Sequence, residues 1–268
     1  MRADTDTFDT WFSSGQWPFA SLTHPDSKDY KTYYPTNVME TGGDLIFFWI
    51  SRMIMLGLYV TGELPFKQVY MHGLVLDAKG NKMSKSKGNV INPLDLTTKY
   101  GTDAFRIGLI VGNTPGTSLP LSEDKIRAYK NFANKVWNIT RFVLTGIESF
   151  DLNSTPAITE TDKKHLDTLQ ETIKDITTDM DSYRFYMASE KIYHYIWHTF
   201  ADIIIEESKA ALNGSDENAK KSKQFMLYEI LKTSLKVLHP FMPFVTEEIW
   251  SDLPHQNKNL LIIETWPA

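Results

Sequence analysis

The chain has no cysteine, no long uninterrupted apolar run and no excess of basic residues. Without cysteine there are no disulfides or thiolate metal sites, and together with a polar start that shows no charged-then-apolar leader this favours a reducing cytoplasm. The longest apolar region, residues 45–60, is interrupted by Ser51 and Arg52. A bilayer span takes about 20 residues, so we expect no membrane partner. The net charge of -5 argues against a DNA partner, and any contact with RNA would require a local basic face.

The most informative stretch is a basic loop framed by two glycines. Lys82-Met83-Ser84-Lys85-Ser86 lies between Gly80 and Gly88, and residues 79–87 include four lysines. Backbone N–H groups, hydroxyls and ammonium groups on a flexible loop suit the binding of a polyphosphate. A solvated basic turn would have the same composition. The loop alone therefore predicts an anion site without deciding between these two interpretations.

The residues around this loop favour a ligand site. Residues 69–76 have the pattern of a strand that runs into the loop, and a helix is expected to restart at Asn92-Pro93. Open α/β sheets bind ligands at the ends of such strands. The chain therefore predicts an α/β, partly Rossmann-type, nucleotide-binding fold in its first part.

A second pattern of this kind lies earlier in the chain. Residues 36–41 predict a strand that breaks at Gly42-Gly43, and Asp44 then begins a helix that extends to about Gly57. Glycine lets the backbone approach a ribose, and a carboxylate accepts from two hydroxyls. An aspartate that only caps its helix would explain the same residues.

From Ser122 onward the pattern is helical almost to the end. Ser122 is expected to cap a helix, and further helices are expected around residues 166–180, 183–212 and 217–238. We therefore predict an all-α helical bundle. Residues 122–145 include five basic and two acidic side chains. This excess of positive charge fits either a solvated face or an RNA-binding face. The side chains that could contact RNA are Arg127, Lys130, Asn131, Lys135, Asn138 and Arg141.

His194 and His198 are four residues apart, a spacing that can bind zinc. No glutamate of a His-Glu-x-x-His motif and no third ligand accompany them, and large apolar residues surround them. We expect these histidines to be packed in the fold and expect no protein-bound metal.

These residues together resemble a known family. Lys82 to Ser86 is the KMSKS signature of class I aminoacyl-tRNA synthetases, and the similarity to the valine-specific members extends from residues 9–15 to residues 239–250. Ser13-Ser14 is typical of those members, whereas isoleucine-specific relatives generally have Asp-Ser. The resemblance implies that residues 1–121 are the C-terminal half of the catalytic domain and that residues 122–268 are the anticodon-binding domain.

The resemblance also implies roles for individual residues. Trp11, Leu45 and Trp49 would surround the isopropyl group of valine. Gly42 and Asp44 would contact the adenosine, and His72 with Gly73 would meet the adenine. The remaining ATP contacts would come from Met83, Ser84, Lys85 and Ser86.

The family reaction joins valine to ATP and then transfers the valyl group to tRNA(Val). Positioning and cationic stabilisation of the departing pyrophosphate carry the first step. Lys82 and Lys85 are the expected catalytic residues, with Mg²⁺ arriving with ATP. Valine, ATP and tRNA(Val) are thus the expected partners.

The sequence departs from the family pattern in one important way. None of the seven histidines belongs to the His-x-Gly-His motif, which lies in the other half of the catalytic domain. The editing domain of the family is also absent from this sequence. We therefore interpret the chain as a fragment that needs the N-terminal half of the catalytic domain and is inactive alone. The alternatives are a tRNA-binding module without catalytic activity and an isoleucine-specific relative.

Overall fold

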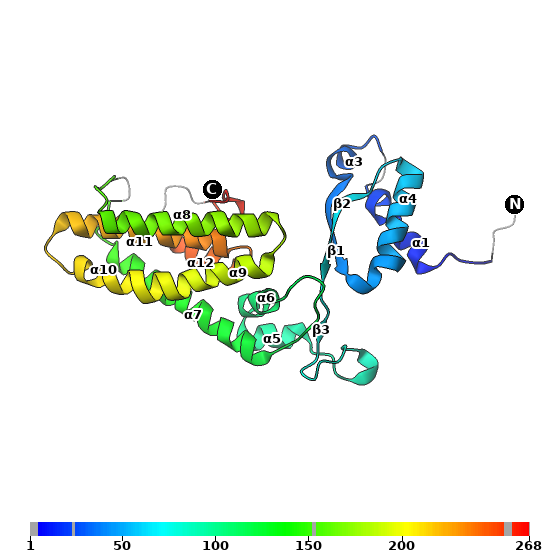
Figure 1. The fold of residues 1–268 in the computed structure, drawn as a ribbon, viewed down its shortest axis with the longest axis horizontal. Helices are drawn as coiled ribbons and strands as arrows, with labels where there is room; N and C mark the ends of the chain where they lie inside the picture. The colour runs from blue at the N-terminus through cyan, green and yellow to red at the C-terminus, as the bar shows by residue number, and fades with distance from the viewer. Residues whose placement is uncertain (1–4, 23–24, 152–153, 255–258, 268) are drawn as a thin grey trace. The chain divides into compact units, whose positions relative to one another are not determined.

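The computed structural model describes residues 5–22, 25–151, 154–254 and 259–267. By packing, the chain divides into two compact units (Figure 1), one within Met1–Leu76 and Thr114–Leu119 and the other within Asp77–Asn113 and Pro120–Ala268. The predicted domain boundary near residue 121 stays a prediction, but packing places the signature loop with the helical part. The reason is that Leu96 and Ile107 share one core with the bundle.

The first unit is built on two parallel strands. Strand β1 (Thr36–Gly42) pairs with β2 (Phe66–His72) in a register that sets Thr36 opposite Phe66 and Gly42 opposite His72. The strands lie side by side in Figure 1. The crossover between them is a continuous helical segment made of η1 (Gly43–Leu45), η2 (Ile46–Ile50) and α4 (Ser51–Thr61). This β-helix-β unit matches the strand and helix that the sequence predicts here.

Short helices complete the first unit. They are α1 (Thr10–Ser14), α2 (Trp17–Ala20) and α3 (Lys28–Tyr33). An aspartate caps α1, since Asp9 Oδ1 accepts from Phe12 N at 2.9 Å. The core of this unit is small, and its buried apolar cluster consists of Ile50, Met53 and Phe66.

The apolar crossover helix is longer than the sequence predicts. The segment Gly43–Thr61 has 19 residues and is, among the described residues, the one helix long and apolar enough by length and composition to cross a membrane. The expectation that this region is too short was therefore wrong. Such a helix is also an ordinary crossover of an α/β fold, and here Met53 packs in one cluster with Phe66 of β2.

The strand predicted over residues 69–76 is interrupted. Strand β2 ends at His72, and β3 (Val75–Leu76) follows after Gly73. A Cβ atom on Gly73 would lie 1.7 Å from Thr117 O, so the backbone of the 114–119 segment passes where a side chain would be. Leu119 N donates to Leu74 O at 3.1 Å, so pairing resumes with a different partner.

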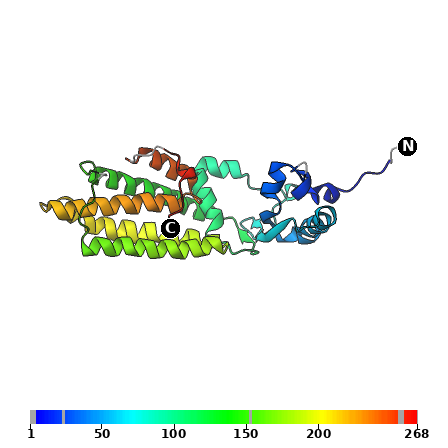
Figure 2. The same ribbon diagram turned by 90° about the horizontal axis from the view of Figure 1, so that it is seen from above.

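The second unit is helical. Helices α5 (Pro93–Tyr100) and α6 (Thr102–Ile110) follow the signature loop, and the long helices of the bundle run side by side in both views (Figures 1 and 2). The bundle consists of α7 (Glu123–Gly146), α8 (Glu160–Asp181), α9 (Phe185–His194), η4 (Tyr195–Ile204), α10 (Ile205–Leu212), α11 (Glu217–Leu238) and α12 (Pro243–Asp252). Because α9, η4 and α10 are continuous, the helices predicted from residue 122 onward are confirmed.

Side-chain caps and apolar stripes explain these boundaries. Ser122 Oγ accepts from Lys125 N at 3.2 Å, as predicted, and Asp216 Oδ1 accepts from the first turn of α11. On α7 the helical spacing from Ile126, Tyr129 and Ala133 predicts that Trp137 lies on the buried face, but this residue is 39% exposed. Phe132 and Ile139 are buried instead, because the inner face of α7 is rotated slightly from the predicted one.

Candidate functional site

The predicted adenosine contacts converge at the carboxyl ends of β1 and β2. A Cβ atom on Gly42 would lie 2.8 Å from Asp44 Oδ1 and 3.6 Å from His72 Nε2. The two strands end opposite each other at Gly42 and His72, which is the edge where open parallel sheets bind ligands. The glycine thus leaves room between a carboxylate and an imidazole, as a ribose or base would require.

The sequence analysis missed one residue of this corner. Glu40 Oε1 is hydrogen-bonded to His72 Nδ1 across the paired strands. A carboxylate at Nδ1 orients the ring and leaves Nε2 to face the space beside Gly42. The alternation along β1, which places Glu40 and Gly42 on one side of the strand, could have revealed this pair.

Gly73 has a structural role that the sequence does not indicate. Its missing side chain is required by the close approach of Thr117 O. A role in adenine binding stays a prediction for this residue.

The predicted amino-acid pocket lies on α1 and the crossover helix. Trp11 stacks with Phe48 at a ring-centroid distance of 5.9 Å, and Trp49 Nε1 donates to Ser14 O at 3.0 Å. The helix is not uniformly α-helical here: Leu45 ends a 3₁₀ turn and Trp49 lies in a π-helical turn. The grouping of Leu45 and Trp49 around the valine side chain stays a prediction. Phe48 and Ser14 are the contacts that the sequence analysis missed.

The signature loop belongs to the second unit. Lys82, Lys85 and Ser86 are exposed, whereas Met83 and Ser84 are half-buried. Ser84 Oγ and Ser86 Oγ are 3.2 Å apart, and Gly80 and Gly88 have positive φ angles of 80° and 65°. The two glycines thus form the turns that the sequence predicts. Some of the predicted ATP contacts therefore belong to the first unit and the others to the second.

The predicted RNA face of α7 is partly occupied by protein partners. Arg127 is paired with Asp124, Lys130 Nζ donates to Lys99 O at 3.3 Å, and Lys135 Nζ lies 3.1 Å from Asp202 Oδ1. The side chains of Asn131, Asn138 and Arg141 are exposed. The second half of α7 is therefore the part of the predicted face with the fewest protein contacts.

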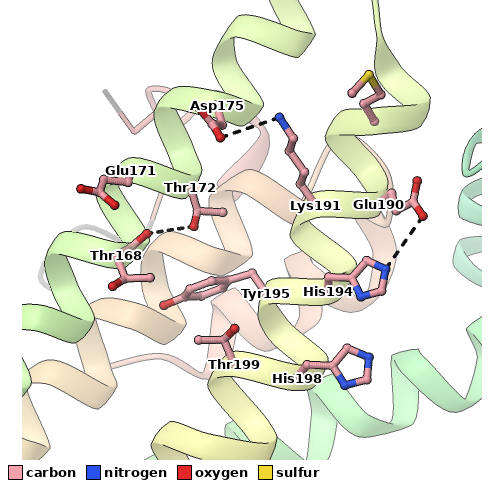
Figure 3. Close-up of a pocket in the computed structure, with 11 residues that line it drawn as sticks. Thr168, Glu171, Thr172, Asp175, Glu190, Lys191, His194, Tyr195, His198 and Thr199 are labelled. Carbon is pink, nitrogen blue, oxygen red and sulfur yellow. Dashed lines mark hydrogen bonds and ion pairs between the residues drawn. The ribbon is translucent and has the colours of Figure 1, made fainter.

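Two cavities that the sequence did not predict lie in the bundle. A cavity of about 420 Å³ beyond the end of this face is lined by Phe142, Thr145, Ser149, Lys209, Asn213 and Lys220, among others. A larger one, of about 580 Å³, lies between α8 and the α9–η4 helix (Figure 3). Its lining includes Glu171, Asp175, Lys191, His194, Tyr195 and His198. Their polar atoms come from two consecutive helices that pack against each other, which a single-helix pattern does not reveal.

The expectation that His194 and His198 are packed in the fold was wrong. Each side chain is 56% exposed, and the two rings stack at 5.3 Å between Glu190 and Asp202. Helical spacing places them on the outer ridge of the helix while Tyr195 points inward. In the part of the chain that the structure describes, no three histidine, aspartate or glutamate side chains are grouped as metal ligands.

Comparison with known proteins gives consistent matches over nearly the whole chain. Residues 1–121 match the family model described as tRNA synthetases class I (I, L, M and V), and residues 162–268 match the anticodon-binding domain of tRNA ligase. The valine–tRNA ligase of Bacillus cereus is 47% identical over 272 residues, which cover 99% of this chain and 30% of that protein. The Bacillus subtilis valine–tRNA ligase is 46% identical and is covered to 31%. The chain thus spans about 30% of the length of the curated relatives it matches.

Solved structures agree on the fold. The LeuRS of Agrobacterium radiobacter, in a ternary complex with tRNA and LeuAMS, has a TM-score of 0.78 at 23% identity, covering 98% of this chain and 33% of that one. The Mycobacterium tuberculosis methionyl-tRNA synthetase bound to methionyl-adenylate has a TM-score of 0.72 at 22% identity, covering 89% and 49%. At these identities the likeness concerns the fold, and it confirms the predicted partial Rossmann-type domain followed by a helical bundle.

Proposed function

The chain belongs to the class I tRNA synthetases, and from this premise we propose that it is part of a valine–tRNA ligase that activates valine with ATP and transfers it to tRNA(Val). The observation that carries the proposal is the intact loop Lys82-Met83-Ser84-Lys85-Ser86 in a chain that matches valine–tRNA ligases at 46–47% identity over 99% of its length. A tRNA-binding module would not need this loop. The cytoplasm stays our proposal for its location.

The chemistry proposed for the site is positional and electrostatic. The carboxylate of valine attacks the α-phosphorus of ATP, the bond to the bridging oxygen breaks, and pyrophosphate leaves with the developing negative charge. Lys82 and Lys85 stabilise that charge, and the exposure of both side chains supports this role. Gly42, Asp44 and His72 hold the adenosine, and the Glu40–His72 hydrogen bond orients the ring. Mg²⁺ arriving with ATP would neutralise part of the charge on the phosphates.

The apolar side chains of Trp11 and Trp49 would contact the valine side chain. Both indoles lie on the α1–η2 interface together with Phe48. An apolar wall of this kind discriminates between valine and isoleucine through one methylene group. The resulting difference in binding free energy is about 1–3 kcal/mol. The names of the matched relatives favour valine over isoleucine.

We propose that tRNA(Val) contacts the second half of α7. Asn138 and Arg141 are exposed there, and the neighbouring cavity adds the basic side chain of Lys220. Amide and guanidinium groups can hydrogen-bond the bases and phosphates of unstacked loop nucleotides.

We also propose that a further part of the catalytic domain completes the first unit. Phe47 and Tyr59 of the crossover helix are 75% and 88% exposed, and the matched relatives are about three times as long as this chain. Large exposed apolar side chains on one helix are usual where another part of the protein packs.

The test is valine-dependent exchange of labelled pyrophosphate into ATP. We define the grafted ligase as Bacillus subtilis valine–tRNA ligase in which residues 1–268 replace the matching 272 residues. We expect exchange in the grafted ligase and none in the chain alone. Lys85→Ala should slow exchange about 10²- to 10³-fold, as for removal of one charge-stabilising group, and leave tRNA affinity unchanged. Lys67→Ala, an exposed lysine on β2, is the matched control.

Two outcomes would contradict the proposal. An unchanged exchange rate in Lys85→Ala would remove the loop from the chemistry. Absence of exchange in the grafted ligase, together with tRNA binding by the chain alone, would support the tRNA-binding module instead.

A further inference from the structure

The signature loop is closed at its base by two residues outside the five-residue signature. Asp77 Oδ1 accepts from Lys79 N at 2.9 Å and from Asn81 N at 2.8 Å. Asp77 Oδ2 accepts from Asn89 Nδ2 at 2.8 Å. Asp77 begins the loop and Asn89 ends it, so this last bond joins its two ends.

The same asparagine also holds the middle of the loop. Asn89 Oδ1 accepts from Ser84 N at 2.9 Å, directly before Lys85. One side chain therefore fixes both the base of the loop and the backbone that leads to the proposed catalytic lysine. We call the Asp77–Asn89 pair and its bond to Ser84 the loop clasp.

The partners of Asp77 matter because of its charge. Asp77 is the sole acidic residue in 77–89, a stretch with four lysines. An unsatisfied carboxylate there would attract a lysine ammonium and compete with phosphate. It accepts instead from backbone N–H groups and side-chain amides. The Asn81 N–H and then the Asn89 amide hold the pKa of Asp77 at about 2.

We propose that Asp77 and Asn89 are positioning residues, which close the signature loop and keep its single carboxylate away from the lysines that bind the polyphosphate. A loop that is held closed by its own side chains loses less conformational freedom when a ligand binds. The inference deepens the proposed function and rests on it for the identity of the polyphosphate as ATP.

The first experiment measures tryptic cleavage of the native chain after Lys82, Lys85 and Lys87 by mass spectrometry. Asn89→Ala removes the clasp bonds to Asp77 and Ser84, so cleavage should accelerate about tenfold, as expected for lost hydrogen bonds to a charged group. Asn81→Ala is the matched control, because its side-chain amide is 3.4 Å from both Asp77 oxygens and its closer bond is made by the backbone. It should change cleavage less than about twofold.

A charge-neutral exchange of the two residues separates the clasp from general destabilisation. In Asp77→Asn alone, the side-chain oxygens of both residues stay with their backbone donors, so an amide nitrogen faces an amide nitrogen. In Asn89→Asp alone, a carboxylate faces a carboxylate. The double variant Asp77→Asn/Asn89→Asp restores a donor opposite an acceptor and keeps an acceptor for Ser84 N. Both single variants should open the loop, and the double variant should return cleavage to within about twofold of the parent. Absence of rescue would overturn the clasp.

The second experiment separates the clasp from the proposed function. In the grafted ligase, Asn89→Ala should slow pyrophosphate exchange about tenfold and leave valyl transfer from preformed adenylate to tRNA unchanged. The double variant Asp77→Asn/Asn89→Asp should restore the rate of pyrophosphate exchange. Faster cleavage with an unchanged exchange rate would overturn the positioning role. An unchanged rate in Lys85→Ala as well would instead overturn the proposed function.

Discussion

The two units of the chain have equally well-formed local structure but very different cores. In the second unit one continuous apolar core extends from Leu96 of α5 to Leu261. In the first unit the buried apolar cluster has three members, while Phe47 and Tyr59 are largely exposed. Side-chain caps are present in both, and the first unit adds a regular strand register. The difference teaches that the stability of this chain lies in the helical unit.

The signature loop is attached to the more stable unit. Helix α6, which follows the loop through α5, is held to the start of α12 by Asp103. Its two carboxylate oxygens accept from Phe244 N at 3.1 Å and Val245 N at 2.6 Å. Arg106 adds a bond to Pro240 O at 3.1 Å. The proposed catalytic lysines are thus connected to the same core as the anticodon-binding match.

The largest expected effect is in the helical unit. Asp162 of α8 is fully buried and accepts from Lys223 Nζ and Ser222 Oγ of α11, both at 2.5 Å. Asp162→Ala leaves the lysine buried without its partner, so it should destabilise the bundle by about 3–5 kcal/mol. Urea unfolding followed by circular dichroism measures this change, because the helical unit dominates the signal.

An exposed ion pair on the same helix provides the control. Lys164 and Glu160 are 3.1 Å apart, with side chains 73% and 86% exposed. Lys164→Ala should cost less than about 0.5 kcal/mol. Equal effects of the two substitutions would mean that α8 and α11 are not held together by the buried pair.

The next effect tests whether the units unfold separately. Met53 is fully buried in the first unit, and Met53→Ala should destabilise that unit by about 2–5 kcal/mol. Hydrogen exchange should then become faster in β1, β2 and α4 but stay unchanged in α8 and α11. Faster exchange in α8 and α11 would show that the two units unfold together, which would contradict their separate stabilities.

The sequence predicts the helical unit better than the first one. Apolar spacing of three and four residues and caps such as Ser122 are local signals, so they place the long helices well. Residue 73 shows the limit of such signals. The sequence indicates a continuous strand there, but Gly73 faces the backbone of Thr117, a contact between residues 44 positions apart.

Site residues follow the same rule. The signature lysines and the Gly42–Asp44 turn are readable because each lies in one short motif. Glu40 opposite His72 requires the strand pairing. Phe48 beside Trp11 requires the packing of α1 against η2, which the spacing along one helix does not show. Contacts that depend on a partner element lie beyond sequence patterns.

The smallest expected effect concerns two buried tyrosines of the helical unit. Tyr228 Oη donates to Pro254 O at 3.0 Å, whereas the buried Tyr195 Oη, beside the cavity of Figure 3, has no hydrogen-bond partner among the described residues. Burial raises the pKa of both phenols, that of Tyr228 to about 12. Tyr228→Phe should lower the free energy of unfolding by about 1 kcal/mol, because a carbonyl loses its donor. Tyr195→Phe removes a hydroxyl that is buried without a bond, so it should leave stability unchanged or raise it slightly. A loss of stability in Tyr195→Phe as large as in Tyr228→Phe would show that the hydroxyl beside the cavity is hydrogen-bonded in solution, which would make the cavity a polar, hydrated feature of the bundle.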